Sequence, residues 1–255
     1  MVNVLRCLGD LEQLGARGGE WLRTASENGD IYGAVWMRLH TAMVPLAGDD
    51  PTTAEQELRD SVAGWSSSLF TPQHMVGILL ATEVDLYRGN AQEAFPRLEE
   101  VWSVATRSFA MGWQITRIWA VALRGGAALA AARQHRADGG AERDQALARA
   151  RRCAALLDKE GRRPHARGPA LVLHAGLASW REQPDRAAEL LAQAAEQFRD
   201  AGMALHAASA LWGRGQLVAD AAAATAAREA ESTLRASGVK NVARWARMYL
   251  PGVLP

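Results

Sequence analysis

The side chains that could do chemistry in this chain of 255 residues are six histidines, two cysteines and two pairs of adjacent acidic residues. Successive histidines are at least nine positions apart, so no helix would carry two of them at the three- or four-residue spacing of a metal site. Glu99 and Glu100 would point about 100° apart on a helix, too far for both carboxylates to act on one substrate atom. Asp49 and Asp50 precede a predicted helix, whose N-terminus favours negative charge, so we interpret both as capping residues. The pattern therefore predicts no metal site and no pair of catalytic carboxylates.

Motifs for nucleotide binding and catalysis are missing from the sequence. It contains no GxxxxGK[ST] phosphate loop, no HExxH, no GxSxG and no kinase catalytic loop. Gly213 and Gly215 form a GxG that lacks the third glycine of a dinucleotide loop, so we interpret it as a point of close helix packing. Cys7 and Cys153 form no CxxC pair and are expected to be buried thiols. We predict a chain that is not an enzyme and binds no cofactor.

Charge is unevenly distributed along the chain, although the formal net charge is only +1. Residues 1–105 carry 7 basic and 15 acidic groups, whereas residues 106–182 carry 14 basic and 6 acidic groups. The basic segment 133–167 has no aromatic residue on which a nucleic-acid base could stack. We therefore rank nucleic-acid binding behind a solvated basic surface and behind contacts with the acidic first part of the chain or with neighbouring domains.

Aromatic and basic residues together offer the best candidate for an interaction surface. The chain has nine tryptophans, and most of them are expected to be core anchors. A concave face lined by Trp and Arg would nevertheless suit a peptide or a small effector. The residues that we select for such a surface are Trp113, Arg117, Arg162, Arg163 and Arg167.

The elements that must position these residues are helices, because β-branched residues are sparse and 51 residues are alanine. The pattern is strongest at 186–201, where Ala187, Leu191 and Ala194 fall on one apolar face. Pro184 is expected near the start of this helix, and Gly202 is expected to end it in a left-handed conformation. The same apolar spacing recurs at 91–102, after a possible N-cap at Asn90.

Turn residues divide the chain into helical hairpins that open near residues 30, 72, 112, 168 and 203. These spacings are typical of helical-hairpin repeats, and two units fit a degenerate tetratricopeptide pattern without its usual aromatic residue. We predict an all-α fold, a right-handed superhelical array of antiparallel helical hairpins, with alanines at the seams between helices. Residues 1–29 would form an N-terminal helical cap and residues 30–255 one continuous array. A non-repetitive helical bundle is the alternative.

Segments that could direct the chain to a membrane are not evident. Arg6, Asp10 and Glu12 interrupt the first turns, so the sequence predicts no signal peptide. The longest apolar stretch, 118–132, contains Arg124 and two glycines and is too short and too polar to span a bilayer. Few cysteines and no disulfide pattern fit a reducing compartment. We expect a cytoplasmic protein that does not contact membranes.

Several longer motifs resemble those of a known family. They are Leu86-Tyr87-Arg88-Gly89-Asn90-Ala91-Gln92-Glu93-Ala94, Gln114-Ile115-Thr116-Arg117, Glu196-Gln197-Phe198-Arg199-Asp200-Ala201-Gly202-Met203 and Gly238-Val239-Lys240-Asn241-Val242-Ala243-Arg244. Over roughly residues 20–252 the chain resembles the C-terminal tetratricopeptide-like region of large bacterial Ser/Thr protein kinases that also carry an ATPase module. This resemblance implies a sensor or interaction platform beside catalytic domains. It transfers no catalytic residue, because the family's catalytic motifs are missing here.

The sequence thus supports two main functional hypotheses. The first is a non-catalytic scaffold that binds a protein partner, or neighbouring domains of a larger signalling protein. The alternative is a small-molecule effector sensor with a Trp- and Arg-lined pocket. Nucleic-acid binding through the basic segment 133–167 comes third.

Overall fold

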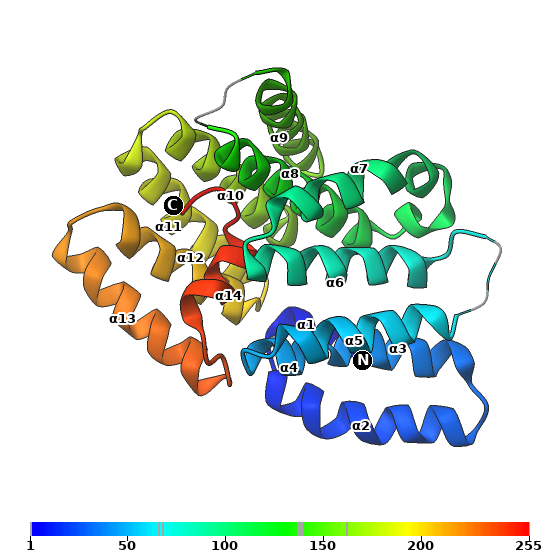
Figure 1. Cartoon of the computed structure of the whole chain (residues 1–255). Coiled ribbons are helices and arrows are strands. Elements are labelled where there is room, and N and C mark those ends of the chain that lie inside the picture. The colour runs from blue at the N-terminus through cyan, green and yellow to red at the C-terminus, as the bar shows by residue number, and fades with distance from the viewer. Residues whose placement is uncertain (1, 66, 68, 137–139, 162, 255) are drawn as a thin grey trace.

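The computed structural model describes residues 2–65, 67, 69–136, 140–161 and 163–254, and every regular element among these residues is helical (Figure 1). The elements are α1 (Val2–Leu8), α2 (Leu11–Glu27), α3 (Ile31–Thr41), α4 (Met43–Ala47), α5 (Pro51–Ala63), α6 (Pro72–Arg88), α7 (Ala91–Arg107), the 3₁₀ turn η1 (Phe109–Gly112), α8 (Gln114–Gln134), α9 (Ala141–Lys159), α10 (Pro164–Trp180), α11 (Pro184–Asp200), α12 (Ala204–Leu217), α13 (Ala221–Ala236) and α14 (Val242–Tyr249). The predicted all-α class is confirmed for the described residues.

Helix starts follow local capping chemistry. The Asp30 carboxylate accepts a hydrogen bond of 2.8 Å from the Gly33 backbone N–H at the start of α3, and Asp50 accepts one of 3.0 Å from the Thr53 N–H in α5. These bonds satisfy N–H groups that the first turn of a helix leaves without partners. Asn90 precedes α7 as predicted, although its side chain makes no capping bond.

Gly202 and Asp49 adopt the left-handed backbone conformation after helices. Gly202 has φ +72° and follows Ala201, the C-cap of α11, in agreement with the predicted helix end. Asp49 has φ 62° and does not cap a helix, which differs from the capping role that we predicted for it. Its carboxylate accepts hydrogen bonds from the Tyr87 hydroxyl at 2.7 Å, from Asn241 at 3.2 Å and from Arg244 at 3.2 Å.

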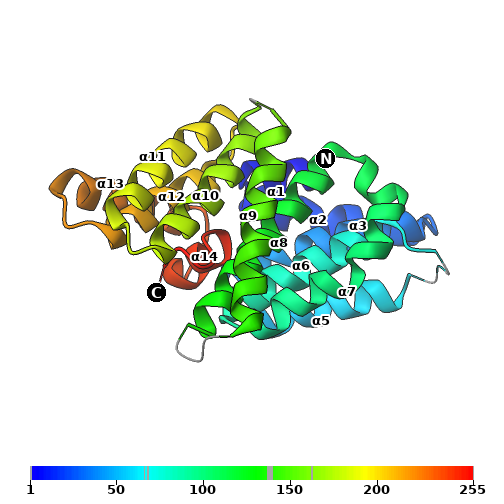
Figure 2. The same cartoon turned by 90° about the horizontal axis from the view of Figure 1, so that it is seen from above.

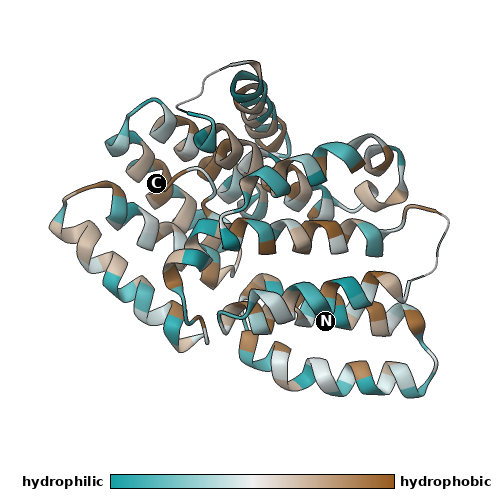
Figure 3. Cartoon of the chain, in the orientation of Figure 1, coloured by the Kyte–Doolittle hydropathy of each residue, from teal (hydrophilic) through white to brown (hydrophobic). Residues whose placement is uncertain are grey.

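Alanine and glycine residues let neighbouring helices approach closely. Ala94 on α7 and Ala187 on α11 are fully buried, at 0% exposure. A side chain at Gly213 on α12 would overlap Leu250, which accounts for the GxG in that helix as a close-packing point. Interiors at this density leave little room for added atoms. Figure 3 shows that most helices carry both apolar and hydrophilic residues, as helices with one packed face do.

Consecutive helices pack against one another around a central space that contains α1 and α14 (Figure 1). Seen from above, α8 and α9 lie between α1–α7 on one side and α10–α14 on the other (Figure 2). Parts of the chain that are distant in sequence meet here: Gly9 contacts Leu205, and the Lys240 N–H donates to the Ala47 carbonyl at 2.9 Å. Helix α1 packs against α2 and α3, and α14 packs against α6, α12 and α13.

Ion pairs connect the acidic first part of the chain with its basic middle. Glu99 on α7 accepts from Arg124 on α8 at 2.6 Å and from Arg149 on α9 at 2.7 Å. The Arg124 guanidinium also lies 3.9 Å from the centroid of the Trp102 ring. Part of the uneven charge distribution is therefore accounted for by contacts within the chain.

Helix α8 is long and apolar enough to cross a membrane by length and composition, and it is the one described helix that passes this test. Its apolar window is 72% buried inside the protein, where α8 packs against α7, α9 and α10. The apolar residues of α8 therefore pack in the protein core.

Substitution of a seam alanine by arginine should destabilise the fold. Ala94→Arg and Ala187→Arg would each place an unpaired charge between packed helices, so we expect each to lower the unfolding free energy by about 3–5 kcal/mol. The measurement is urea unfolding followed by circular dichroism. Ala16→Arg, at an exposed position of α2, is the control and should change stability by less than about 0.5 kcal/mol. Equal stability of all three variants would contradict the seam assignment.

Candidate functional site

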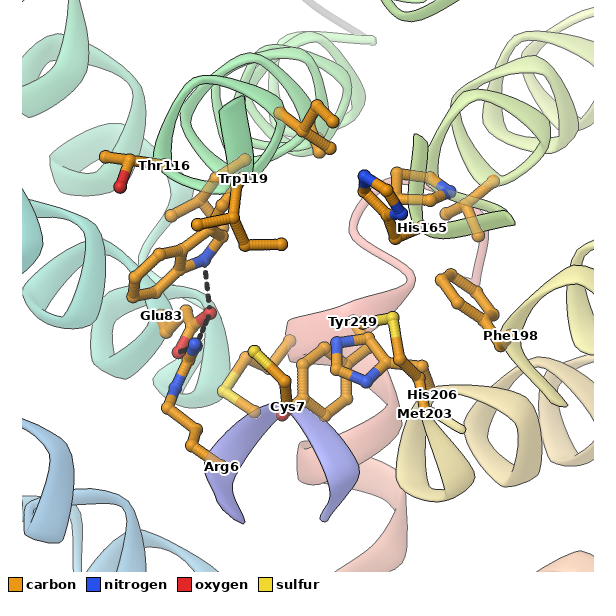
Figure 4. Close-up of a pocket in the computed structure, with 18 of the residues that line it drawn as sticks. Arg6, Cys7, Glu83, Thr116, Trp119, His165, Phe198, Met203, His206 and Tyr249 are labelled. Atoms are coloured by element: carbon orange, nitrogen blue, oxygen red, sulfur yellow. Dashed lines mark hydrogen bonds and ion pairs between the residues drawn. The ribbon is translucent and has the colours of Figure 1, made fainter. Parts of the chain in front are cut away.

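A cavity lies at the centre of the molecule, where α1, α6, α8, α10, α12 and α14 converge (Figure 4). Its volume is about 110 Å³. An apolar protein cavity of about 150 Å³ accommodates a benzene molecule, so the space here is close to that of one ring. The walls are mainly apolar. The lining includes the side chains of Arg6, Glu83, Trp119, His165, Phe198, Met203, His206 and Tyr249.

Arg6 and Glu83 form a buried ion pair on one wall of the cavity. The Arg6 Nη2 donates to both Glu83 carboxylate oxygens, at 2.6 and 2.7 Å, and Trp119 Nε1 donates to the same carboxylate at 2.8 Å. The guanidinium carbon also lies 3.9 Å from the centroid of the Trp119 ring. Burial lowers the pKa of Arg6, but Glu83, Tyr249 and Cys7 together raise it by more, so the net shift is upward and Arg6 stays charged. The Arg6 Nε is buried without a hydrogen-bond partner.

His206 lies on the opposite side of Cys7 from this ion pair, beside Met203 and Tyr249 (Figure 4). Its ring centroid is 4.1 Å from that of Tyr249 and 5.2 Å from that of Phe198. Burial lowers the pKa of His206 to about 3, with a smaller contribution from the Arg6 charge, so its imidazole is neutral at pH 7. The His206 Nδ1 is buried without a hydrogen-bond partner.

The two features together define the electrostatics of the cavity. Its charged pair, Arg6 and Glu83, is internally neutralised, and His206 adds no charge. Two polar atoms, Arg6 Nε and His206 Nδ1, remain unpaired although most buried polar atoms in proteins have partners. The arrangement can therefore offer hydrogen bonds to a bound molecule, but no uncompensated charge.

The cavity reaches the surface beside an aromatic cluster. Trp113 is 38% exposed and Ile115 is 39% exposed, and both line the cavity together with Trp36. The Trp113 ring makes edge contacts with Trp36 and Phe109, each with centroids 6.2 Å apart. This exposed cluster marks the cavity mouth.

The structure places the predicted surface residues in two different regions. Trp113 lines the cavity, and Arg117 pairs with Glu160 at 2.7 Å and donates to the Met111 carbonyl at 3.1 Å. Arg163 donates to the side chain of Gln114, so these residues gather near the start of α8.

Arg167 is exposed and lines a separate groove between α9, α10 and α11. Arg162 lies outside the described residues. The predicted set is therefore divided between the neighbourhood of the cavity mouth and this groove.

Sequence reasoning missed the residues that give the cavity its polar character. Arg6, Glu83, His165, His206 and Tyr249 come from five different helices and share no local spacing. One signal was present in the sequence. Glu83 interrupts the apolar run of α6 and His206 interrupts that of α12, and polar groups on a buried helix face require a specific environment.

Comparisons with known proteins yield no relative for this chain: no family model matches it, and neither a curated protein nor a solved structure does so. Among the described residues, no group of three His, Cys, Asp or Glu side chains could hold a metal ion.

Removal of one partner of the Arg6–Glu83 pair should cost more than removal of both. Glu83→Leu or Arg6→Met alone leaves a buried charge unpaired, so we expect a loss of about 3–5 kcal/mol for each. The double variant should lose clearly less than the sum of the two, as measured by urea unfolding. The exposed pair Arg186 and Glu189 is the matched control, with losses below about 1 kcal/mol. Additive losses at Arg6 and Glu83 would contradict the coupling.

Acid should weaken the fold through buried histidines. Burial lowers the pKa of His40 and of His206 to about 3, against an ordinary value of 6.5, so the unfolded chain binds protons that the folded chain excludes. Stability is therefore unaffected above pH 6.5 and falls as the pH decreases from 6.5 towards 3, by up to about 1.4 kcal/mol per pH unit for each histidine. His40→Gln should give a shallower dependence between pH 5 and 6.5 in urea unfolding. An unchanged slope would show that His40 becomes protonated in the folded state.

Proposed function

We propose that this chain is a non-catalytic helical-repeat module that binds a small effector molecule in its central cavity. The single observation that carries the proposal is the cavity itself, because two of its lining residues, Arg6 and His206, each have a buried polar atom (Nε and Nδ1) without a hydrogen-bond partner. Proteins rarely leave both space and hydrogen-bonding capacity unused in the interior, because each lowers stability. A bound molecule would fill the space and satisfy the unpaired atoms.

The positions of α1 and α14 favour a small ligand over a long peptide at this site. Both helices lie in the central space of the molecule, and Arg6 and Tyr249 from them form part of the cavity wall. What remains open is a pocket of about 110 Å³, which is too small for a peptide segment. In this proposal the helices form a right-handed superhelical array of degenerate tetratricopeptide-like hairpins, with α1 and α14 as internal walls.

A protein-interaction scaffold is the second candidate, and the groove that contains Arg167 favours it. Arg151, Arg167 and Arg181 are exposed along this groove, and none of them forms an ion pair within the described part of the chain. Its floor is apolar, formed in part by Leu171 and Leu190. Such a surface is complementary to an acidic amphipathic segment of a partner. The resemblance to the C-terminal regions of bacterial signalling kinases would place this partner, or neighbouring domains, in a cytoplasmic signalling protein.

Filling the cavity should abolish small-molecule binding. The test uses four ring-sized probes (phenol, cyclohexanol, benzoate and benzylamine) in ligand-observed NMR with the whole chain. We expect at least one probe to bind with a Kd below about 1 mM and to lose at least tenfold in affinity with Ala122→Phe, whose added ring would enter the cavity.

The matched control is Ala130→Phe, on the same helix but outside the cavity lining, which should leave affinity unchanged. Thermal unfolding of both variants checks that they fold. The effector proposal is overturned if none of the four probes binds the unmodified chain, or if both variants bind equally well.

A further inference from the structure

The chemistry of the cavity wall narrows the class of effector, and this inference rests on the proposed function. We infer that the cavity selects an uncharged, single-ring aromatic molecule that carries one hydroxyl group, for which phenol is the simplest representative. The size of the site, its charge balance, its wall composition and its unpaired polar atoms all favour this class.

Charge balance excludes ions as preferred ligands. The Arg6 guanidinium directs one nitrogen to both Glu83 oxygens, and the same carboxylate accepts from Trp119. A bound anion would compete with Glu83 for Arg6, and a bound cation would compete with Arg6 for Glu83. Either ion would also lose its hydration without gaining a free counter-charge, which is costly in an apolar cavity.

Wall composition favours an aromatic ring over an aliphatic one. Trp119, Phe198 and Tyr249 present aromatic surfaces on three sides, and Met203 and Met248 contribute thioethers. Aromatic rings gain about 0.5–1.5 kcal/mol from offset or edge contacts with other rings, beyond the area that they bury. Sulfur atoms beside a ring edge add a further attraction. A volume of about 110 Å³ leaves room for about one ring inside the cavity.

The unpaired atoms call for a group that can both accept and donate a hydrogen bond. Arg6 Nε carries a hydrogen and can only donate, so it requires an acceptor. His206 Nδ1 belongs to a neutral imidazole, in which the unpaired nitrogen either accepts or donates according to the tautomer. A hydroxyl group can accept from Arg6 Nε and can pair with His206 Nδ1 in either tautomer. A carbonyl group can only accept and an ammonium group can only donate, so each pairs with fewer of these atoms.

Calorimetric titration of the whole chain with matched probes tests this class. We expect phenol to bind at least tenfold more tightly than toluene, which has the same ring without the hydroxyl, and more tightly than cyclohexanol, which has the hydroxyl without the aromatic ring. Benzoate and benzylamine, charged at pH 7, should bind at least 100-fold more weakly than phenol. His206→Phe preserves an aromatic ring in the wall and should reduce the phenol-to-toluene ratio.

The outcomes separate this inference from the proposed function. Toluene, cyclohexanol or a charged probe binding as tightly as phenol would overturn the ligand class and leave the effector-binding function standing. An unchanged ratio of phenol to toluene affinity in a folded His206→Phe variant would also overturn the ligand class, because His206 would then not be the partner of the hydroxyl group. If none of the five probes binds, the class and the proposed function fail together. The ranking in the unmodified chain decides the matter even if His206→Phe does not fold.

Discussion

The ion pair between Arg6 and Glu83 connects the first helix to the centre of the molecule. Arg6 belongs to α1, whereas Glu83 and Trp119 belong to α6 and α8, so a single buried network links three helices that are distant in sequence. A buried charge without its partner would cost several kcal/mol, which makes the position of α1 conditional on Glu83. Because Arg6, Glu83 and Trp119 all line the central cavity, the same network also forms one wall of it.

The last helix is held in a comparable way from the other side. Asp49, after α4, accepts hydrogen bonds from Tyr87 and from Asn241 and Arg244 at the start of α14. Helix α14 then supplies Tyr249, whose ring packs on His206. The cavity is therefore bounded by two short helices that are fixed by polar contacts with α6 and its neighbours, while the longer helices pack through alanine, leucine and glycine. In this account, polar groups determine the site and apolar groups determine the fold.

Local chemistry made the all-helical class and many helix boundaries predictable from the sequence. Asp30 and Asp50 cap helices, Pro72 and Pro184 open them, and Ala94 and Ala187 are buried, because each of these roles depends mostly on near neighbours in sequence. Asp49 was misassigned because its partners lie 38 or more residues away. The cavity could not be predicted from the sequence for the same reason, because five helices that are distant in sequence supply its polar residues. Trp113 was selected and does line it, but Arg117 is engaged by Glu160.

The central claim is that the unpaired atoms of the cavity wall are the partners of a bound ring. The NMR signal of the Arg6 Nε–H group reports on this directly, because the nitrogen is buried and unpaired in the free protein. During titration with phenol, the account predicts that this signal shifts progressively and saturates at the same Kd as the calorimetric titration. A signal that stays unchanged while phenol binds would place the ligand elsewhere and contradict the account.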